Sequence, residues 1–385
     1  MSFTFSLDLA SYIYHEMTRR EEKQGSIDTS KLSASVIIPA HNEAENLERV
    51  VNAQYNQTKQ PKSVVVINDN STDATGEICE SFQKKYSNFI YIHNVPSKGK
   101  AGSIQYVLKN HVDELGDILY VNDGDLIPDD NCLEELVNGF NEPNVAAVTG
   151  IPRLIGGGSR LSRAMTWGKN HQIQVLNWKK TGQTARNGMY VLCGGSMAIR
   201  KDVMIKHPVP TRTQTEDLDY TWVLNENGYK LKFQRTAGCE TYDVTTMKDH
   251  WKQTRRWHKG AWQAVYCHGK ELNKSKGLLY TTLIPSWAES ILYIGELATI
   301  NHFLPCSPEV LAGIFALQAG IGLVGLTLAA KPSYLRYLPE SMMYQGMSIA
   351  SYFISLTETT IQKVMHQEYK WGNKWDKNGG NEKND

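Results

Sequence analysis

Short apolar runs alternate with amphipathic segments from Ser35 onward. Such runs predict strands buried inside a sheet, because residues covered on both faces of a sheet are continuously hydrophobic. The predicted strands are residues 35–39, 63–67, 89–92, 117–121, 146–152 and 229–233. Alternation of strands and helices predicts an α/β fold with a doubly wound, mostly parallel sheet.

Polar residues after the first three strands predict helix starts. Residues 42–47 begin a helix with acids in its first turn. Ser71 or Thr72 can cap the following helix, and residues 98–102 open the next one. Residues 126–128, after the fourth strand, are expected to turn the chain away from the sheet.

Charged side chains follow the first four predicted strands. They are Glu43, Asp69, Lys100, Asp123 and Asp125. Ligands of open α/β sheets bind at the carboxyl ends of strands, so we expect these side chains to line one crevice. Two neighbouring aspartates repel each other unless a hard divalent cation neutralises them. Lys100 beside such a cation suits a diphosphate, which attracts positive charge from both sides.

A single acid after a strand is more often an ordinary turn or cap residue. Several of them at neighbouring strand ends are harder to obtain by chance and favour a polar ligand site. The sequence contains no G-x-G-x-x-G and no Walker A motif, which argues against a dinucleotide enzyme and a P-loop ATPase.

Composition narrows the class of protein further. The 385 residues carry a formal net charge of +1 at pH 7, so no global field attracts nucleic acid. The six cysteines show no C-x-x-C pair and no zinc spacing, which favours free thiols in a reducing compartment. Residues 1–10 lack a basic start and include Asp8, so we predict no cleavable signal peptide.

A glycine-rich segment and a helix start supply further candidates. Residues 191–196 (VLCGGS) form either a tight turn or a backbone that a flat sugar ring can approach closely. Residues 213–216 (TQTE) can form a capping box, and Gly228 ends the helix that follows. Asp217 then lies in the first turn, where the helix dipole favours a carboxylate. That carboxylate either acts as a general base or only stabilises the helix start.

A later helix carries two distinct faces. Helical spacing places Gln253, Arg256 and Trp257 together. An indole can stack on a pyranose ring, and an arginine can neutralise a diphosphate. The opposite face carries basic and aromatic residues of the kind found at a bilayer interface, namely Trp251, Arg255, His258 and Trp262.

The motifs of the first half resemble the nucleotide-sugar half of a family 2 inverting glycosyltransferase with the GT-A fold. The similar segments are residues 36–47, 68–75, 98–101 and 123–125. The resemblance implies that the nucleotide-sugar is bound by Pro39, Glu43, Asp69, Lys100 and Asp123, with Glu43 and Asp69 at the uridine. It also implies that Asp123 and Asp125 hold Mg²⁺ or Mn²⁺. Asn68 departs from the family pattern, which more often has a second Asp there.

The second half resembles the membrane-embedded β-glycan synthases, which include cellulose, chitin, hyaluronan and poly-N-acetylglucosamine synthases. Residues 215–217 match their T-E-D signature, and residues 253–257 match Q-x-x-R-W. Residues 148–153 and the helix through Trp222 are most similar to the poly-N-acetylglucosamine synthases. The resemblance covers about residues 33–268. It implies that Asp217 is the catalytic base, that Gln253 and Arg256 face the nucleotide's diphosphate, and that the acceptor site contains Cys193, Gly194, Glu216 and Trp257.

Three stretches in the C-terminal third are candidates for membrane spans. Residues 310–330 are uncharged and about as long as a bilayer requires. Residues 278–300 include Glu289 and Glu296, which a span must shield, and residues 341–361 are a weaker candidate. The flanking basic residues predict that the first two form a hairpin with both ends on the cytoplasmic side. No span is predicted before the catalytic domain, unlike in the full synthases, so a polymer channel made by one chain is not expected. The alternatives to such a channel are short products, a lipid-linked acceptor or oligomerisation.

The predicted organisation has five parts. They are an N-terminal amphipathic segment (1–31), a GT-A domain (32–250), an amphipathic interface helix (251–277), membrane-associated helices (278–365) and a polar tail (366–385). We expect a membrane enzyme with its catalytic domain on the cytoplasmic side. It would move a hexose, such as N-acetylglucosamine, from a UDP-sugar to a hydroxyl of a glycan or lipid-linked acceptor, once or in succession. The alternatives are a soluble family 2 enzyme that modifies a protein or nucleic acid, and an inactive relative that only binds nucleotide-sugar.

Overall fold

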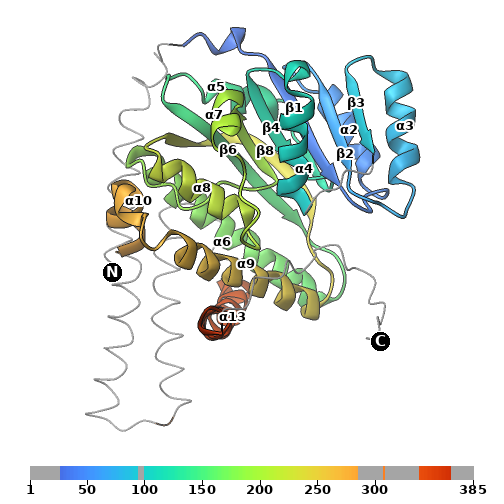
Figure 1. The fold of residues 1–385 in the computed structure, drawn as a ribbon. Coiled ribbons are helices and arrows are strands. Elements are labelled where there is room, and N and C mark those ends of the chain that lie inside the picture. Colours follow the sequence, from blue (N-terminus) through green and yellow to red (C-terminus); the bar gives the residue numbers. More distant parts are fainter. Residues whose placement is uncertain (1–26, 94–98, 285–306, 308–337, 366–385) are drawn as a thin grey trace.

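The computed structural model describes residues 27–93, 99–284, 307 and 338–365. The predicted N-terminal amphipathic segment, apart from residues 27–31, and the polar tail after residue 365 lie outside this part of the chain. The described elements form a central sheet with helices on both faces (Figure 1).

The sheet has eight strands in the order β3-β2-β1-β4-β7-β6-β8-β5. The strands are β1 (Ala34–Ala40), β2 (Val64–Asn68), β3 (Phe89–His93), β4 (Ile118–Asn122), β5 (Leu126–Pro128), β6 (Val145–Ile155), β7 (Ser196–Arg200) and β8 (Lys230–Tyr242). The first four in that order are parallel, whereas β7 runs antiparallel to β4 and β6, and β5 runs antiparallel to β8. The sheet is therefore mixed, and the α/β prediction holds.

Each face of the sheet has its own hydrophobic core. One face packs against α4 (Gly99–Asn110), α7 (Lys201–Lys206) and α8 (Glu216–Glu226), and the other against α2 (Leu47–Tyr55), α3 (Thr75–Lys85) and α5 (Cys132–Asn138). Successive strand residues point to opposite faces, so Ile37 joins the first core and Val36 the second. Because both faces are covered, every residue of β1 is buried.

The ends of the strands bring distant loops together. The parallel strands β1, β2 and β4 end at the same edge of the sheet, at Ala40, Asn68 and Asn122. β7 begins at that edge because it is antiparallel to β4, with Ser196 opposite Asn122. The loops after three strands therefore meet the loop that precedes β7.

Two predicted helix starts are wrong in detail. α2 begins at Leu47, and Asn42 instead adopts a left-handed turn with φ of 53°. The N–H of Asn42 donates to Ser71 Oγ at 2.9 Å, and Asn42 Oδ1 accepts from the Thr72 N–H at 2.8 Å. The side chains of Asn42 and Ser71 therefore tie the two strand-end loops together.

The sequence predicted that Ser71 or Thr72 caps α3, and this prediction is wrong. Its first residue, Thr75, donates its N–H to Asp73 Oδ1 at 3.0 Å. Residues 126–128, predicted to turn the chain away, form β5 and pair with β8. A three-residue strand has too short a pattern to be distinguished from a turn by sequence.

A long helix was not predicted. α6 (Arg160–Ala185) begins after Ser159, whose Oγ accepts the N–H of Ser162. Its buried face carries Ser162, Thr166 and Lys169, so the apolar period that normally reveals a helix is interrupted.

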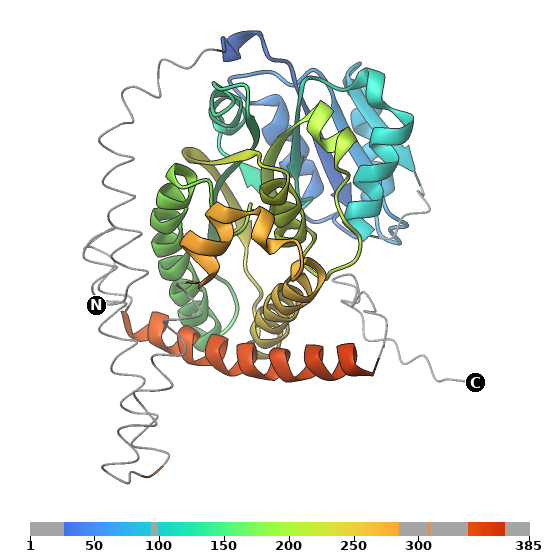
Figure 2. The same ribbon diagram turned by 60° about the vertical axis from the view of Figure 1, so that its left-hand side comes forward.

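α9 (Met247–His268) begins before the predicted interface helix, and Thr246 caps it. α13 (Leu338–Val364) crosses below α6 and α9 (Figure 2) and contacts both. Arg255 forms an ion pair with Glu358, His258 lies 3.1 Å from Ser351 Oγ, and the Trp262 indole donates to the Tyr352 carbonyl at 3.3 Å. The basic and aromatic stripe predicted to meet a bilayer therefore packs against α13 in these three contacts.

Within the described ranges, no helix is long and apolar enough to cross a membrane. The weaker candidate, residues 341–361, falls in α13, so its prediction as a span is wrong. Residues 310–330 lie outside the described part, as does all of 278–300 beyond Ile284.

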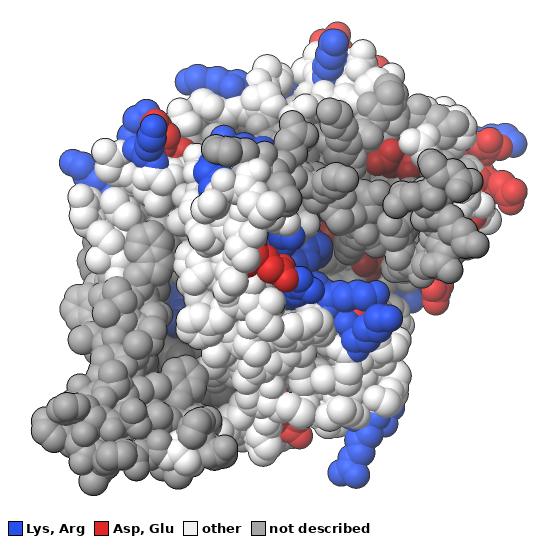
Figure 3. Space-filling view, turned by 60° about the horizontal axis from the view of Figure 1, so that its bottom comes forward, with Lys and Arg blue, Asp and Glu red and all other residues white. Residues whose placement is uncertain are grey.

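On the side of the molecule where α13 lies, Lys and Arg side chains gather near the middle, beside acidic ones (Figure 3).

The contact between α8 and α9 can be tested through two matched glycines. A methyl group at Gly260 of α9 would lie 2.2 Å from Thr215 Oγ1. Apart from the local helix backbone, no atom of the described residues would lie within 4 Å of a methyl group at Gly346 of α13. We expect Gly260→Ala to lower the free energy of unfolding by about 1–3 kcal/mol through overpacking. Gly346→Ala should raise it by up to about 1 kcal/mol through helix propensity. Denaturant titrations measure both, and equal effects would contradict the close packing of α8 on α9.

Candidate active site

The ammonium group of Lys100 is the centre of the candidate site. Lys100 lies in the first turn of α4 and is largely buried. Its Nζ donates to Asp123 Oδ1 at 2.5 Å and to the Gly194 carbonyl at 2.7 Å, and it lies 3.5 Å from Glu216 Oε1. One side chain of α4 therefore joins the loop after β4, the loop before β7 and the start of α8.

Asp217 lies against the same glycine-rich loop. The Gly194 N–H donates to Asp217 Oδ2 at 3.1 Å, and the Leu218 N–H donates to Oδ1 at 2.8 Å. A methyl group at Gly194 would lie 2.8 Å from Asp217 Oδ2, and one at Gly195 would lie 2.8 Å from Asp123 Oδ2. Both glycines are therefore needed for the backbone to approach the two carboxylates.

The causes of the pKa shifts differ between Asp217 and Lys100. Burial, together with the neighbouring Glu216 carboxylate, raises the pKa of Asp217 to about 6, although Lys100 and Arg256 act in the other direction. Burial lowers the pKa of Lys100, but the Asp123 and Glu216 carboxylates outweigh it and raise that pKa overall. Lys100 is therefore a fixed positive charge, whereas Asp217 changes its charge as the pH passes through about 6.

The helix that carries Asp217 starts where predicted but without the predicted capping box. α8 begins at Glu216, and the Thr215 side chain makes no capping hydrogen bond. Thr215 Oγ1 is buried without a hydrogen-bond partner among the described residues, because it packs against Gly260. Glu216 points to Lys100 instead of back to the helix start. Gly228 follows the helix with φ of 76°, as a helix-ending glycine does.

The predicted nucleotide residues lie at the adjoining strand ends. Glu43 is buried, and its N–H donates to Thr75 Oγ1 at 2.9 Å. A methyl group at Gly124 would lie 3.0 Å from Glu43 Cγ and 3.5 Å from the Pro39 carbonyl, so the Asp123–Asp125 turn packs on this loop. The Asp69 N–H donates to the Ala40 carbonyl at 2.8 Å, which places Asp69 beside the end of β1.

Asn68, the departure from the family pattern, is a buried structural residue. Its Oδ1 accepts the Ser71 N–H at 2.9 Å, and its Nδ2 donates to the Tyr91 hydroxyl at 3.1 Å. An aspartate could accept the first bond but could not donate the second. The amide therefore suits its neighbours, and Asp69 is the acid available at this strand end.

The paired aspartates have the chemistry of a hard-cation site. Asp123 and Asp125 flank Gly124 in the turn between β4 and β5, and both side chains are partly exposed. The donors are all carboxylate oxygens, which fit Mg²⁺ or Mn²⁺. Among the described residues, no group of three or more His, Cys, Asp or Glu is placed to hold a metal ion.

Three of the predicted residues lie on α9. Gln253 Oε1 accepts from Lys169 Nζ at 2.5 Å, and the same ammonium lies 5.8 Å from the centre of the Trp257 ring. Arg256 Nη1 lies 3.4 Å from the Gln214 carbonyl, just before α8. Arg256 thus joins the Asp217 cluster through its charge, whereas Gln253 and Trp257 face Lys169 of α6.

The structure joins five of the predicted residues at one edge of the sheet. Lys100, Asp123, Gly194, Glu216 and Asp217 contact one another through the bonds above. Sequence reasoning missed Lys169 and Asp243, which form a buried ion pair with a 2.9 Å separation behind Gln253. They lie on α6 and at the end of β8, and no motif links them.

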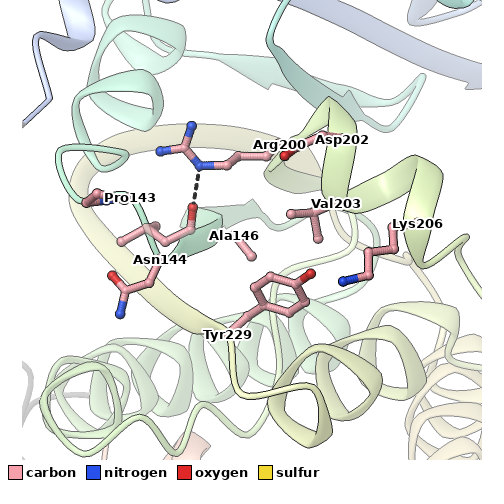
Figure 4. A pocket seen from close by; sticks show the side chains of 9 residues that line it. Pro143, Asn144, Ala146, Arg200, Asp202, Val203, Lys206 and Tyr229 are labelled. Carbon is pink, nitrogen blue, oxygen red and sulfur yellow. Dashed lines mark hydrogen bonds between the residues drawn. The ribbon is translucent and has the colours of Figure 1, made fainter.

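A separate cavity of about 180 Å³ lies at the opposite edge of the sheet (Figure 4). Its lining includes Asn144, Arg200, Lys206 and Tyr229, and Arg200 Nε donates to the Val145 carbonyl at 2.7 Å. None of the predicted site residues lines this cavity, because it lies at the other end of β7.

A mixed α/β sheet of this kind, with acids at the ends of its parallel strands, is similar to the GT-A-like architecture of glycosyltransferases. Residues 35–207 match the family model described as Glycosyl transferase family 2. The match assigns this segment, and not the whole chain, to a family 2 glycosyltransferase domain.

Named relatives support this assignment. The poly-beta-1,6-N-acetyl-D-glucosamine synthase of Staphylococcus aureus (strain COL) is 24% identical over 257 residues, which is 66% of this chain and 61% of the relative. The probable glycosyltransferase YdaM of Bacillus subtilis (strain 168) is 28% identical over 233 residues, which is 59% of this chain and 54% of the relative. The chain thus matches about three fifths or less of the length of these relatives.

A solved structure is similar in fold. The mannosyltransferase PcManGT from Pyrobaculum calidifontis, in complex with GDP-Man and Mn²⁺, aligns with a TM-score of 0.62. The alignment covers 95% of this chain and 96% of that one, at 17% sequence identity. This similarity supports the fold.

The close approach at Gly194 predicts a loss of activity without a loss of fold. Gly194→Ala places a methyl group against the Asp217 carboxylate, which must move. We expect glycosyl transfer to fall at least tenfold, because small displacements of reacting groups have effects of that order. Gly346→Ala serves as the matched control and should retain activity. Steady-state assays of both variants, with circular dichroism to check folding, test the prediction, and an active Gly194→Ala variant would contradict the geometry.

Proposed function

We propose that the protein transfers a hexose, such as N-acetylglucosamine, from a UDP-sugar to a hydroxyl of a glycan or lipid-linked acceptor, with inversion. The observation that carries the proposal is the contact of Lys100 with Asp123, Gly194 and Glu216, next to Asp217. A fixed cation, a carboxylate for a metal and a carboxylate that titrates near neutrality are the groups such a transfer needs. The name of the Staphylococcus aureus relative supports the sugar and the glycan acceptor.

Asp217 would act as the general base. Its carboxylate takes the proton of the acceptor hydroxyl while the hydroxyl oxygen attacks the anomeric carbon. The bond from that carbon to the diphosphate breaks on the opposite face, so the configuration inverts and UDP leaves. A pKa of about 6 keeps Asp217 ionised at neutral pH while leaving it basic enough to accept the proton.

Asp123 and Asp125 would hold Mg²⁺ or Mn²⁺ together with the diphosphate oxygens. When bound, the cation supplies Lewis-acid stabilisation of the leaving diphosphate. Lys100 places a second positive charge beside Asp123, so it would bind the same diphosphate. Arg256 and Gln253 would contact the diphosphate from α9.

The remaining predicted residues divide between donor and acceptor. Pro39, Glu43 and Asp69 lie at the ends of β1 and β2, where they would contact the uridine. Cys193, Gly194, Glu216 and Trp257 would border the acceptor, with the sugar stacked on the indole.

The acceptor proposal includes association with a membrane, with the catalytic domain on the cytoplasmic side. Its support is the similarity to a glycan synthase and the apolar stretches of residues 278–300 and 310–330. Partitioning of the full chain between membrane and soluble fractions tests it, and complete recovery from the soluble fraction without detergent would contradict it.

The proposed function is tested by a donor screen. The full chain is incubated with UDP-sugars and with GDP-mannose, each with Mg²⁺ or Mn²⁺, and released nucleotide is measured. We expect metal-dependent release of UDP and a product whose mass increases by a hexose unit. Release from GDP-mannose alone would overturn the choice of nucleotide, and no release from any donor would overturn the proposed activity.

Asp217→Asn tests the base. We expect turnover to fall by about 100-fold or more while UDP binding stays nearly unchanged, because the role lies in the transition state. In the wild-type enzyme, kcat/KM should fall as the pH drops below about 6, since a protonated Asp217 cannot accept a proton. Asp249→Asn is the control, because Asp249 also lies in the first turn of a helix but contacts Thr246 and Lys252. Wild-type turnover in Asp217→Asn would remove Asp217 from the mechanism.

A further inference from the structure

Lys169 is a buried lysine whose ammonium group has a defined set of partners. Its side chain is 2% exposed, and that of Asp243 is fully buried. Nζ donates to both Asp243 oxygens, at 2.9 and 3.1 Å, and to Gln253 Oε1 at 2.5 Å. These contacts join α6, the residue after β8 and α9.

Asp243 is held from several sides. Thr166 Oγ1 donates to its Oδ2 at 2.8 Å, and the Val244 N–H donates to its Oδ1 at 2.9 Å. His250 Nδ1 lies 3.7 Å from Oδ2, while its Nε2 lies 2.9 Å from Ser162 Oγ. The carboxylate therefore has little freedom, and it fixes the lysine.

The lysine in turn fixes the orientation of the Gln253 amide. An ammonium group has donors and no acceptor, so the amide must turn its oxygen to Lys169 and its NH₂ group away. No hydrogen bond from that NH₂ group to another described residue is present. Gln253 is partly exposed, so an incoming acceptor atom can reach its side chain.

The same ammonium lies beside the rings of Trp257 and Tyr344, at 5.8 and 5.9 Å from their centres. Cation–π attraction at this range favours a fixed ring position. Lys169 therefore contacts two of the three residues that form one face of α9, Gln253 and Trp257.

We propose that Lys169, held by Asp243, is a positioning residue that aims the Gln253 amide donors at the diphosphate oxygens of the donor nucleotide. This inference rests on the proposed function, because it takes the ligand of Gln253 to be a nucleoside diphosphate. Lys169 itself does not touch that ligand.

A double-mutant cycle with UDP as the probe tests the proposal. UDP affinity is measured by calorimetry on the full chain with Mn²⁺ for the wild type, Lys169→Met, Gln253→Leu and the double variant. We expect each single variant to weaken binding roughly tenfold, and the double variant to bind no more weakly than Gln253→Leu. Equal losses from Lys169→Met in both backgrounds would overturn the proposal, because Lys169 would then act independently of Gln253.

Gln253→Glu provides a second test. Unlike Lys169→Met, it does not leave the buried Asp243 carboxylate without its cationic partner. A carboxylate keeps the contact with Lys169 but has no donors, so this variant should fold and still bind UDP as weakly as Gln253→Leu. Wild-type affinity in Gln253→Glu would overturn the proposal even if Lys169→Met does not fold.

Lys232→Met is the matched control. Lys232 is a mostly buried lysine that pairs with Glu142 at 2.5 Å, away from the candidate site. Its loss should lower thermal stability and leave UDP affinity unchanged. Absence of UDP binding by the wild type would overturn the proposed function and this inference together. Weakened binding in the Gln253 variants with unchanged binding in Lys169→Met would overturn the inference alone.

Discussion

The candidate site depends on the buried ammonium of Lys100. It joins Asp123, the Gly194 carbonyl and Glu216, which come from parts of the chain more than 20 residues apart. Removing one partner of such a buried ionic contact usually costs about 3–5 kcal/mol, because the remaining charge is left without compensation. The same contact holds the glycine-rich loop against Asp217, so the position of the proposed base depends on the position of the proposed diphosphate ligand.

Much of this arrangement could be predicted from the sequence. The buried strands are continuous apolar runs, and the acids at their ends follow from the rule that ligands bind at the carboxyl ends of parallel strands. That rule correctly places Glu43, Asp69 and Asp123 at one edge. The rule does not predict that Gly194 and Gly195 approach two carboxylates. These glycines precede β7, and they reach this edge only because β7 runs antiparallel to β4, which the sequence does not reveal.

The parts that could not be predicted are those in which polar residues are buried. α6 was missed because Ser162, Thr166 and Lys169 occupy its buried face, where an apolar period is expected. The partners of Lys169 lie 74 and 84 positions along the chain, beyond the range of any spacing rule. The aromatic and basic face of α9 suggested a bilayer, and its contacts with α13 supply a partner that the local pattern could not reveal.

The most direct test of the account is a structure of the full chain with UDP and Mn²⁺ bound. The account predicts that the diphosphate lies between Lys100 and the pair Asp123 and Asp125, with Asp217 facing the position of the sugar. A nucleotide bound elsewhere, such as the cavity lined by Arg200 and Tyr229, would contradict the central claim.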